Sequence, residues 1–95
     1  MFRHVVLFRI HDGVPPDAID EALANIRELV SATATVGEVC LSEDARKGTV
    51  IVEDLTFESR TDFERFRAHP VHRTASDQMK GISDWLIADW ESSLA

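Results

Sequence analysis

The stretch FRHVVLFRI, residues 2–10, decides the fold of this 95-residue chain, because its side chains alternate in the way of a β-strand. One face carries mainly apolar side chains and a single histidine, namely Phe2, His4, Val6, Phe8 and Ile10. The other face carries two arginines, but also Val5 and Leu7 between them. Since both faces hold apolar residues, we expect the strand to be covered on both sides, at least in its middle.

The pattern changes to a helical one after a turn at residues 11–13. A helix should start at residues 15–17, where prolines are tolerated, and its apolar side chains recur at helical spacing from Ile19 to Val30. The serine and threonines beyond Val30 should end this helix. Short extended patterns follow at residues 36–41 and 49–57, joined by a polar segment, residues 42–48, which we expect to be an exposed connection.

The second half of the chain repeats the helix–strand order. Thr61 and Glu64 have the spacing of a capping box, which predicts the start of a second helix. Pro70 should begin a further helical run toward Gly81, and residues 85–90 alternate as a fourth strand. The order predicts one α+β domain over residues 1–95, with a ferredoxin-like split βαβ arrangement: a four-stranded antiparallel sheet with its helices on one face.

The second face of this sheet is left without helices although it is apolar. Val5, Leu7, Val50 and Val52 are expected on it. Burying about 800 Å² per partner, at about 25 cal/mol per Å² of apolar area, is a large contribution for a small domain. We therefore predict a homodimer through the sheet face, which would form a dimeric α/β barrel.

The composition narrows the classes of partner. The net charge is −7, and the basic residues are dispersed, which argues against a nucleic-acid surface. The lone Cys40 excludes an intrachain disulfide and is expected to be a small buried residue. We expect no membrane partner, since no stretch approaches the ~20 apolar residues of a membrane span. Without a signal-peptide pattern at the N-terminus, we expect a cytoplasmic protein.

The candidate functional residues are histidines at the ends of these elements. His72 would be near the third residue of the helix that begins at Pro70, where the partial positive charge of the helix N-terminus favours a neutral imidazole, as a general base needs. His4 would face the helices, either as a hydrogen-bonded core residue or as an acid–base group of a pocket. His69 is more consistent with capping the following helix.

A metal site of His4, His69 and His72 is the weaker alternative. Two imidazoles three residues apart can share a helix face, but a proline separates them and no acidic residue stands at ligand spacing. The adjacent Glu53 and Asp54 point to opposite strand faces and cannot act together. We predict neither a metal nor a cofactor.

Three segments resemble the stress-responsive α/β barrel domain, Dabb: HVVLF at residues 4–8, FES at 57–59 and FRAHPVH at 66–72. The resemblance implies a dimeric α/β barrel of ferredoxin-like subunits and leaves the activity undetermined. One plant branch of that family cyclises polyketide chains by an intramolecular aldol condensation, and its histidines match His4 and, as general base, His72. This chain departs from that branch at Phe66, where the branch has a tyrosine.

We therefore consider three hypotheses for the function. The first is a protein that binds a small apolar molecule in a pocket between sheet and helices, with contacts from Phe8, Phe63, Phe66, His69 and Met79. The second is a cofactor-free cyclase or lyase, in which His72 takes a proton alpha to a carbonyl while His4 polarises or orients the oxygen. The third is a structural oligomer whose core is filled and has no pocket.

Overall fold

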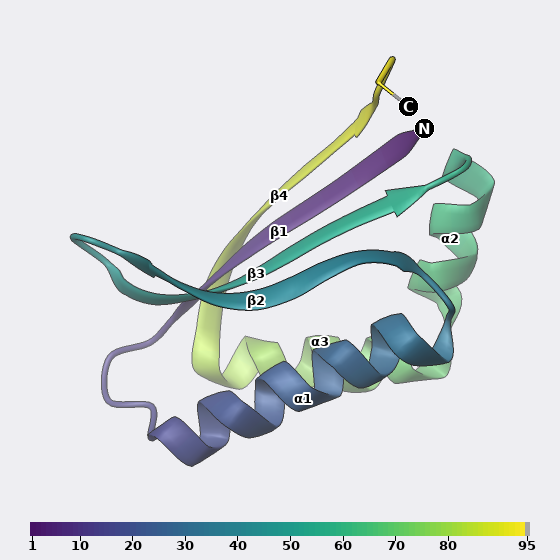
Figure 1. Ribbon diagram of the computed structural model, residues 1–95. Helices are drawn as coiled ribbons and strands as arrows, with labels where there is room; N and C mark the ends of the chain where they lie inside the picture. Colours follow the sequence, from purple (N-terminus) through teal and green to yellow (C-terminus); the bar gives the residue numbers. More distant parts are fainter. Residues whose placement is uncertain (95) are drawn as a thin grey trace.

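A computed structural model describes residues 1–94 and shows an antiparallel sheet with all its helices on one face (Figure 1). The sheet order is β2-β3-β1-β4, so the N-terminal strand β1 lies in the interior of the sheet. The ferredoxin-like α+β fold is confirmed. In chain order the elements are β1 (Phe2–Ile10), α1 (Pro16–Ala32), β2 (Val36–Asp44), β3 (Gly48–Phe57), α2 (Arg60–Ala68), α3 (Pro70–Ile82) and β4 (Ser83–Glu91).

The core lies between the sheet and the helices. Every second residue of β1, from Phe2 to Ile10, is buried there, as the alternation predicts. The helix α1 contributes the stripe Ala22, Leu23, Ile26 and Leu29. On β3, Glu53 shares the buried face with Ile51 and Leu55, and it is only 5% exposed. A charged residue thus occupies a core position in the middle of the sheet.

Several boundaries differ from those expected. The helix α1 continues to Ala32, two residues beyond the expected end, and Thr33 Oγ1 then donates a hydrogen bond to the Leu29 carbonyl at 2.7 Å. The polar segment 42–48 is mostly strand. The connection between β2 and β3 is therefore short. The Asp44 carboxylate stabilises this turn by accepting hydrogen bonds from the backbone N–H groups of Arg46 and Lys47, at 2.8 and 2.9 Å.

The capping-box prediction is wrong. Helix α2 begins at Arg60, and Ser59 is its N-cap, with an extended backbone and a hydroxyl that accepts a hydrogen bond from the Asp62 N–H at 3.2 Å. Thr61 lies inside the first turn of α2, two residues after Ser59, so it is not the N-cap. The two helices α2 and α3 meet at His69, directly before Pro70.

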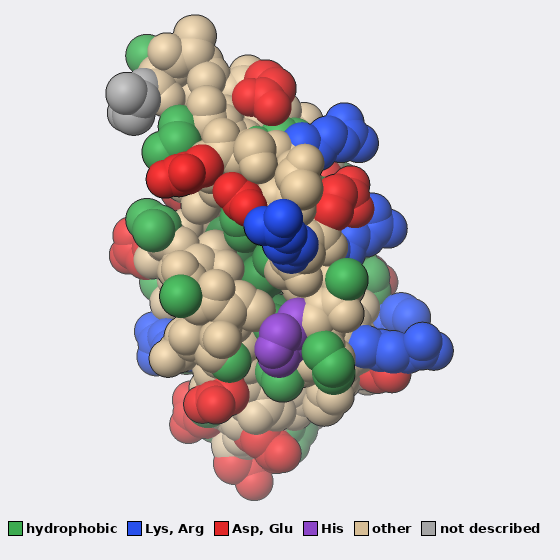
Figure 2. Space-filling view, turned by 90° about the vertical axis from the view of Figure 1, so that its right-hand side faces the viewer, with side chains coloured by type: hydrophobic (Ala, Val, Ile, Leu, Met, Phe, Trp, Pro, Cys, Tyr) green, Lys and Arg blue, Asp and Glu red, His purple; other side chains and the backbone are tan. Residues whose placement is uncertain are grey.

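Within residues 1–94, no helix covers the opposite face of the sheet (Figure 1). Leu7 and Leu86 are 42% and 74% exposed, while Cys40 is half-buried rather than fully buried. The Arg3 guanidinium forms an ion pair with Asp54 at 2.6 Å and lies 5.4 Å from the ring centre of Trp90. At the end of the molecule where α2 lies, the surface carries interspersed acidic, basic and apolar side chains (Figure 2). None of the described helices is long and apolar enough to cross a membrane.

Candidate functional site

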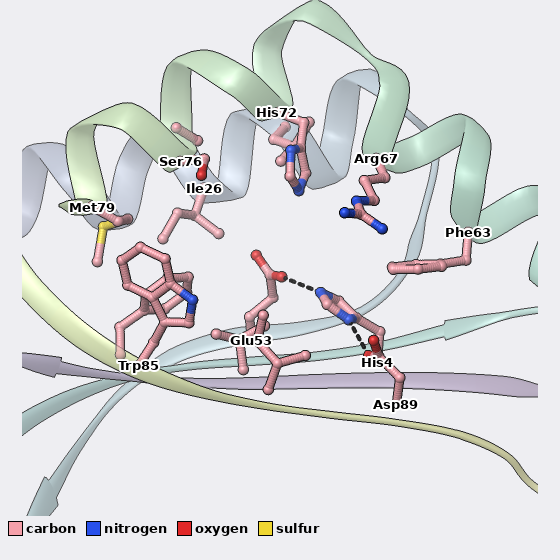
Figure 3. A pocket seen from close by; sticks show the side chains of 15 residues that line it. His4, Ile26, Glu53, Phe63, Arg67, His72, Ser76, Met79, Trp85 and Asp89 are labelled. Carbon is pink, nitrogen blue, oxygen red and sulfur yellow. Dashed lines mark hydrogen bonds and ion pairs between the residues drawn. The ribbon is translucent and has the colours of Figure 1, made fainter.

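A cavity of about 360 Å³ lies between the sheet and the helices. Figure 3 shows side chains from the sheet on one side of it and side chains from the helices on the other. It is lined by His4, Val6, Phe8, Ile26, Leu29, Glu53, Phe63, Arg67, His72, Ala75, Ser76, Met79, Trp85, Ile87 and Asp89. This cavity argues against the hypothesis of a completely filled core.

His4 lies between two carboxylates. Its Nδ1 donates to Asp89 Oδ1 at 2.5 Å, and its Nε2 forms an ion pair with Glu53 Oε1 at 3.2 Å. The strand register explains this arrangement: Asp89 of β4 lies directly opposite His4, and Glu53 of β3 lies opposite Val6, on the diagonal. Three strands that are distant in sequence therefore build one charged cluster.

These carboxylates decide the protonation of His4. Burial by itself lowers the pKa of the imidazole, but the hydrogen bonds and negative charges of Glu53 and Asp89 together outweigh it, so the pKa is raised above its ordinary value of 6.5. The protonated ring has two N–H donors, and each already has an acceptor. For His4 to polarise a substrate oxygen directly, one of these two contacts would have to break.

His72 approaches the cavity from the opposite side. It extends from the first turn of α3, and its ring meets Phe66 edge-on at 5.3 Å between ring centres. Burial lowers the pKa of His72 below 6.5, and the positive charges of His4 and Arg67 add to this effect, while Glu53 opposes it. At neutral pH the ring is therefore uncharged, which leaves one nitrogen free to accept a proton.

The cavity has a polar end and an apolar end (Figure 3). His4, Glu53, Arg67 and His72 gather at the polar end, together with Asp89. Trp85 and Met79 stand at the other end, where Phe8 packs on Trp85 with 5.8 Å between ring centres. Such a site would accept a molecule with an apolar body and one polar group.

The structure brings together five of the seven site residues predicted from the sequence: His4, His72, Phe8, Phe63 and Met79. Phe63 packs on the His4 ring, at 4.8 Å between ring centres.

The structure places the other two predicted site residues, Phe66 and His69, outside this cavity. Phe66 packs behind His72, and both Phe66 and His69 line a separate, more open hollow beside α2. The Nδ1 of His69 accepts a hydrogen bond from the Val71 N–H at 3.1 Å, so His69 caps α3. Within residues 1–94, no group of three His, Cys, Asp or Glu side chains is arranged to hold a metal ion.

Sequence reasoning missed the carboxylates of this site, and also Arg67 and Ser76. Glu53 offered a signal, because a charged residue on the same strand face as Ile51 and Leu55 is rarely buried without a partner. Asp89 shares its strand face with Trp85, but the pattern of an edge strand does not reveal which face is inside. The partnership of both carboxylates with His4 depends on strand register.

The comparison with protein families agrees with this architecture. The family model described as Stress responsive A/B Barrel Domain matches residues 2–92. The chain belongs to the stress-responsive A/B barrel (Dabb) family. An uncharacterized protein of Streptomyces coelicolor is 28% identical over 97 residues, covering 96% of this chain and 99% of that protein. The stress-response A/B barrel domain-containing protein HS1 of Arabidopsis thaliana is 29% identical over 75 residues, covering 74% of this chain and 69% of HS1.

Solved structures share the Dabb fold over nearly the whole chain. The crystal structure of At3g17210 from Arabidopsis thaliana has a TM-score of 0.78 and 25% identity, covering 100% of this chain and 98% of that one. Hydroxynitrile lyase from Passiflora edulis has a TM-score of 0.81 at 18% identity, with 99% and 94% covered. A dimeric ferredoxin-like protein of unknown function from Bacteroides fragilis has a TM-score of 0.75 at 21% identity, with 96% and 95% covered. The last two likenesses are in fold alone.

Proposed function

We propose that this Dabb protein binds a small, largely apolar molecule with one polar group in the cavity between sheet and helices. The observation that carries the proposal is the division of the cavity wall, with the His4 cluster at one end and Trp85, Phe8 and Met79 at the other. A volume of about 360 Å³ suits a ligand of one or two rings rather than a polymer.

Binding can be measured with acetophenone, which has a carbonyl group on an aromatic ring. In a titration followed by two-dimensional ¹H–¹⁵N NMR, the indole N–H of Trp85 should shift and saturate. The indole of Trp90, which lies on the helix-free face beside Arg3, serves as an internal control and should stay constant. Equal movement of both indoles, or no saturable shift, would contradict the proposal.

A pair of substitutions on α3 tests whether the molecule enters the cavity. Ser76 lines the cavity, so Ser76→Phe should fill part of it and weaken the saturable shifts. Thr74 lies on the same helix but is exposed, so Thr74→Phe should leave binding unchanged. If both variants bind acetophenone as the unsubstituted protein does, the molecule does not occupy this cavity.

A second candidate function is a cofactor-free cyclase or lyase with His72 as the general base. It is favoured by one observation: His72 faces the cavity with a lowered pKa, while the pKa of His4 is raised. Two groups whose environments separate their pKa values in this way suit acid–base chemistry. His72 would take a proton from a carbon alpha to a carbonyl, and the Nε2–H of His4, released from Glu53, would donate to the developing enolate oxygen.

This candidate has a direct test in heavy water. If His72 removes a methyl proton of acetophenone and returns a deuteron, the methyl signal should decay faster with the protein than in buffer. His72→Ala should remove the acceleration, whereas His11→Ala, at an exposed histidine that contacts Asp84, should preserve it. A rate equal to that in buffer would exclude this chemistry for a simple aryl ketone.

We also propose that the protein is a homodimer through the helix-free sheet face. Solved structures of the same fold are dimeric proteins. In the single chain, Leu7, Leu86 and Trp90 are 42%, 74% and 43% exposed on this face. Their burial against a second copy would supply the apolar contact area that a stable dimer requires. Sedimentation velocity at micromolar concentration measures the mass directly, and a monomer would contradict the proposal.

A further inference from the structure

Glu53 has an oxygen that the described protein leaves without a partner. Its side chain is only 6% exposed, and Oε1 is engaged by His4 Nε2 at 3.2 Å. Figure 3 shows the second oxygen turned away from His4, toward the helices and into the cavity. In residues 1–94, Arg3 Nε is the only enclosed side-chain nitrogen or oxygen without a hydrogen bond, so this Glu53 oxygen is open to the cavity.

Because this oxygen opens into the cavity, a ligand that fills the cavity removes the oxygen from water, which costs free energy unless the ligand donates a hydrogen bond to it. His4 cannot supply this second contact, because its other nitrogen is held by Asp89. A molecule in the cavity could supply it, provided that the molecule carries an O–H or N–H group. An ether or ketone oxygen has no hydrogen to donate, so a molecule that carries only such an oxygen should bind more weakly than one with a hydroxyl group.

The charges around the cavity favour a neutral donor over a cation. Both nitrogens of His4 face carboxylate oxygens, of Glu53 and Asp89, and these oxygens accept hydrogen bonds, so both nitrogens carry a proton and the ring is positive. Arg67 lines the same end of the cavity. These four side chains already balance one another. An ammonium group would add a positive charge beside His4 and Arg67, whereas a hydroxyl group would add none.

We propose that Glu53 determines the ligand specificity of this cavity, and that it selects an apolar molecule bearing an uncharged hydroxyl group, whose O–H donates to the free carboxylate oxygen. This inference rests on the proposed function, since it requires that the cavity bind a small molecule. It assigns the contact with the ligand to Glu53. His4 is then a positioning residue, because its Nε2 holds the other oxygen of the Glu53 carboxylate.

The test uses three matched probes: para-trifluoromethylbenzyl alcohol, its methyl ether and the corresponding benzylamine. Their affinities for the unsubstituted protein are measured by fluorine NMR. A hydrogen bond to a charged group contributes about 1.5–3 kcal/mol, so the alcohol should bind at least about tenfold more tightly than the ether. This comparison needs no variant and does not depend on how a substitution affects folding.

Glu53→Gln then assigns the preference to this residue. An amide can turn its oxygen toward His4 and its NH₂ group toward the ligand, so it can donate to an ether oxygen. The ratio of alcohol to ether affinity should fall to about one. Glu43→Gln, on the exposed strand β2, is the matched control and should keep the preference. Circular dichroism shows whether each variant is folded.

The outcomes are distinct. A preference for the alcohol that disappears in Glu53→Gln supports the inference. Equal binding of alcohol and ether by the unsubstituted protein overturns it and leaves the proposed binding function standing. Tightest binding of the amine also overturns it, because the site would then select a cation. If neither these probes nor acetophenone binds, the proposed function fails as well.

Discussion

Removal of the His4 imidazole should destabilise the fold more than the loss of any other histidine. In His4→Ala, the two carboxylates of Glu53 and Asp89 lose the donor between them, and Glu53 stays buried with a side-chain exposure of 6%. The variant also loses the packing of the imidazole on Phe63. Both losses act in the folded state only.

The expected cost follows from the burial of the cluster. Breaking a buried ion pair by removing one partner costs about 3–5 kcal/mol, because a charge is left uncompensated. A domain of this size has a total stability of about 5–15 kcal/mol, so the variant would be marginal. His11→Ala is the matched control: His11 contacts Asp84 at 3.2 Å on the exposed surface, where a pair contributes about 0–1 kcal/mol.

The pH dependence separates the charge from the packing. The pKa of His4 is raised in the folded protein, by Glu53 and Asp89 against the effect of burial. The stability that it adds is therefore complete below the unfolded pKa of 6.5, and it is lost as the pH rises through the folded value. The difference in free energy of unfolding between the unsubstituted protein and His4→Ala should be largest below pH 6.5 and smaller once the pH exceeds the folded pKa, where only the packing of the ring remains.

Urea denaturation at fixed protein concentration measures this difference, with the slope checked for constancy. A fixed concentration matters because dimerisation would couple stability to it. A difference that is independent of pH, or that grows as the pH rises, would refute the assignment of a protonated His4 held by two carboxylates. If His4→Ala lowers the free energy of unfolding no more than His11→Ala does, the burial of the His4 cluster does not contribute as argued.

Three further predictions concern His72, the start of α2 and the sheet face. Glu53→Gln should lower the pKa of His72 further below 6.5, because the negative charge of Glu53 raises that pKa. An NMR titration of the His72 ring protons measures this pKa, and an unchanged or raised value would contradict the prediction. Ser59→Ala should lower the free energy of unfolding by about 0.5–2 kcal/mol, and Thr61→Ala by less; equal costs in chemical denaturation would contradict the assigned cap. Leu7→Asp should convert the proposed homodimer to monomers in sedimentation velocity, and an intact dimer would place the interface elsewhere.

Much of the fold can be derived from the sequence alone. The alternation of residues 2–10 identifies both the strand and its buried face, and the order of elements specifies the ferredoxin-like arrangement. Pro70 marks the start of α3 because its ring is compatible with a first helical turn. These features depend on neighbours along the chain, so local periodicity and local backbone preferences are sufficient to find them.

The site depends on contacts that local patterns do not encode. His4, Glu53 and Asp89 meet because three strands pair in one register, and a shift by one residue would turn each side chain to the other face. His69 is adjacent to the site in sequence, but its ring is used to cap α3. The sequence alone determined that His4 lies on the buried face of the first strand. Only tertiary structure decided that carboxylates hold both nitrogens of His4 and leave Glu53 facing the cavity, because hydrogen-bond partners are set by pairing across the sheet rather than by spacing along the chain.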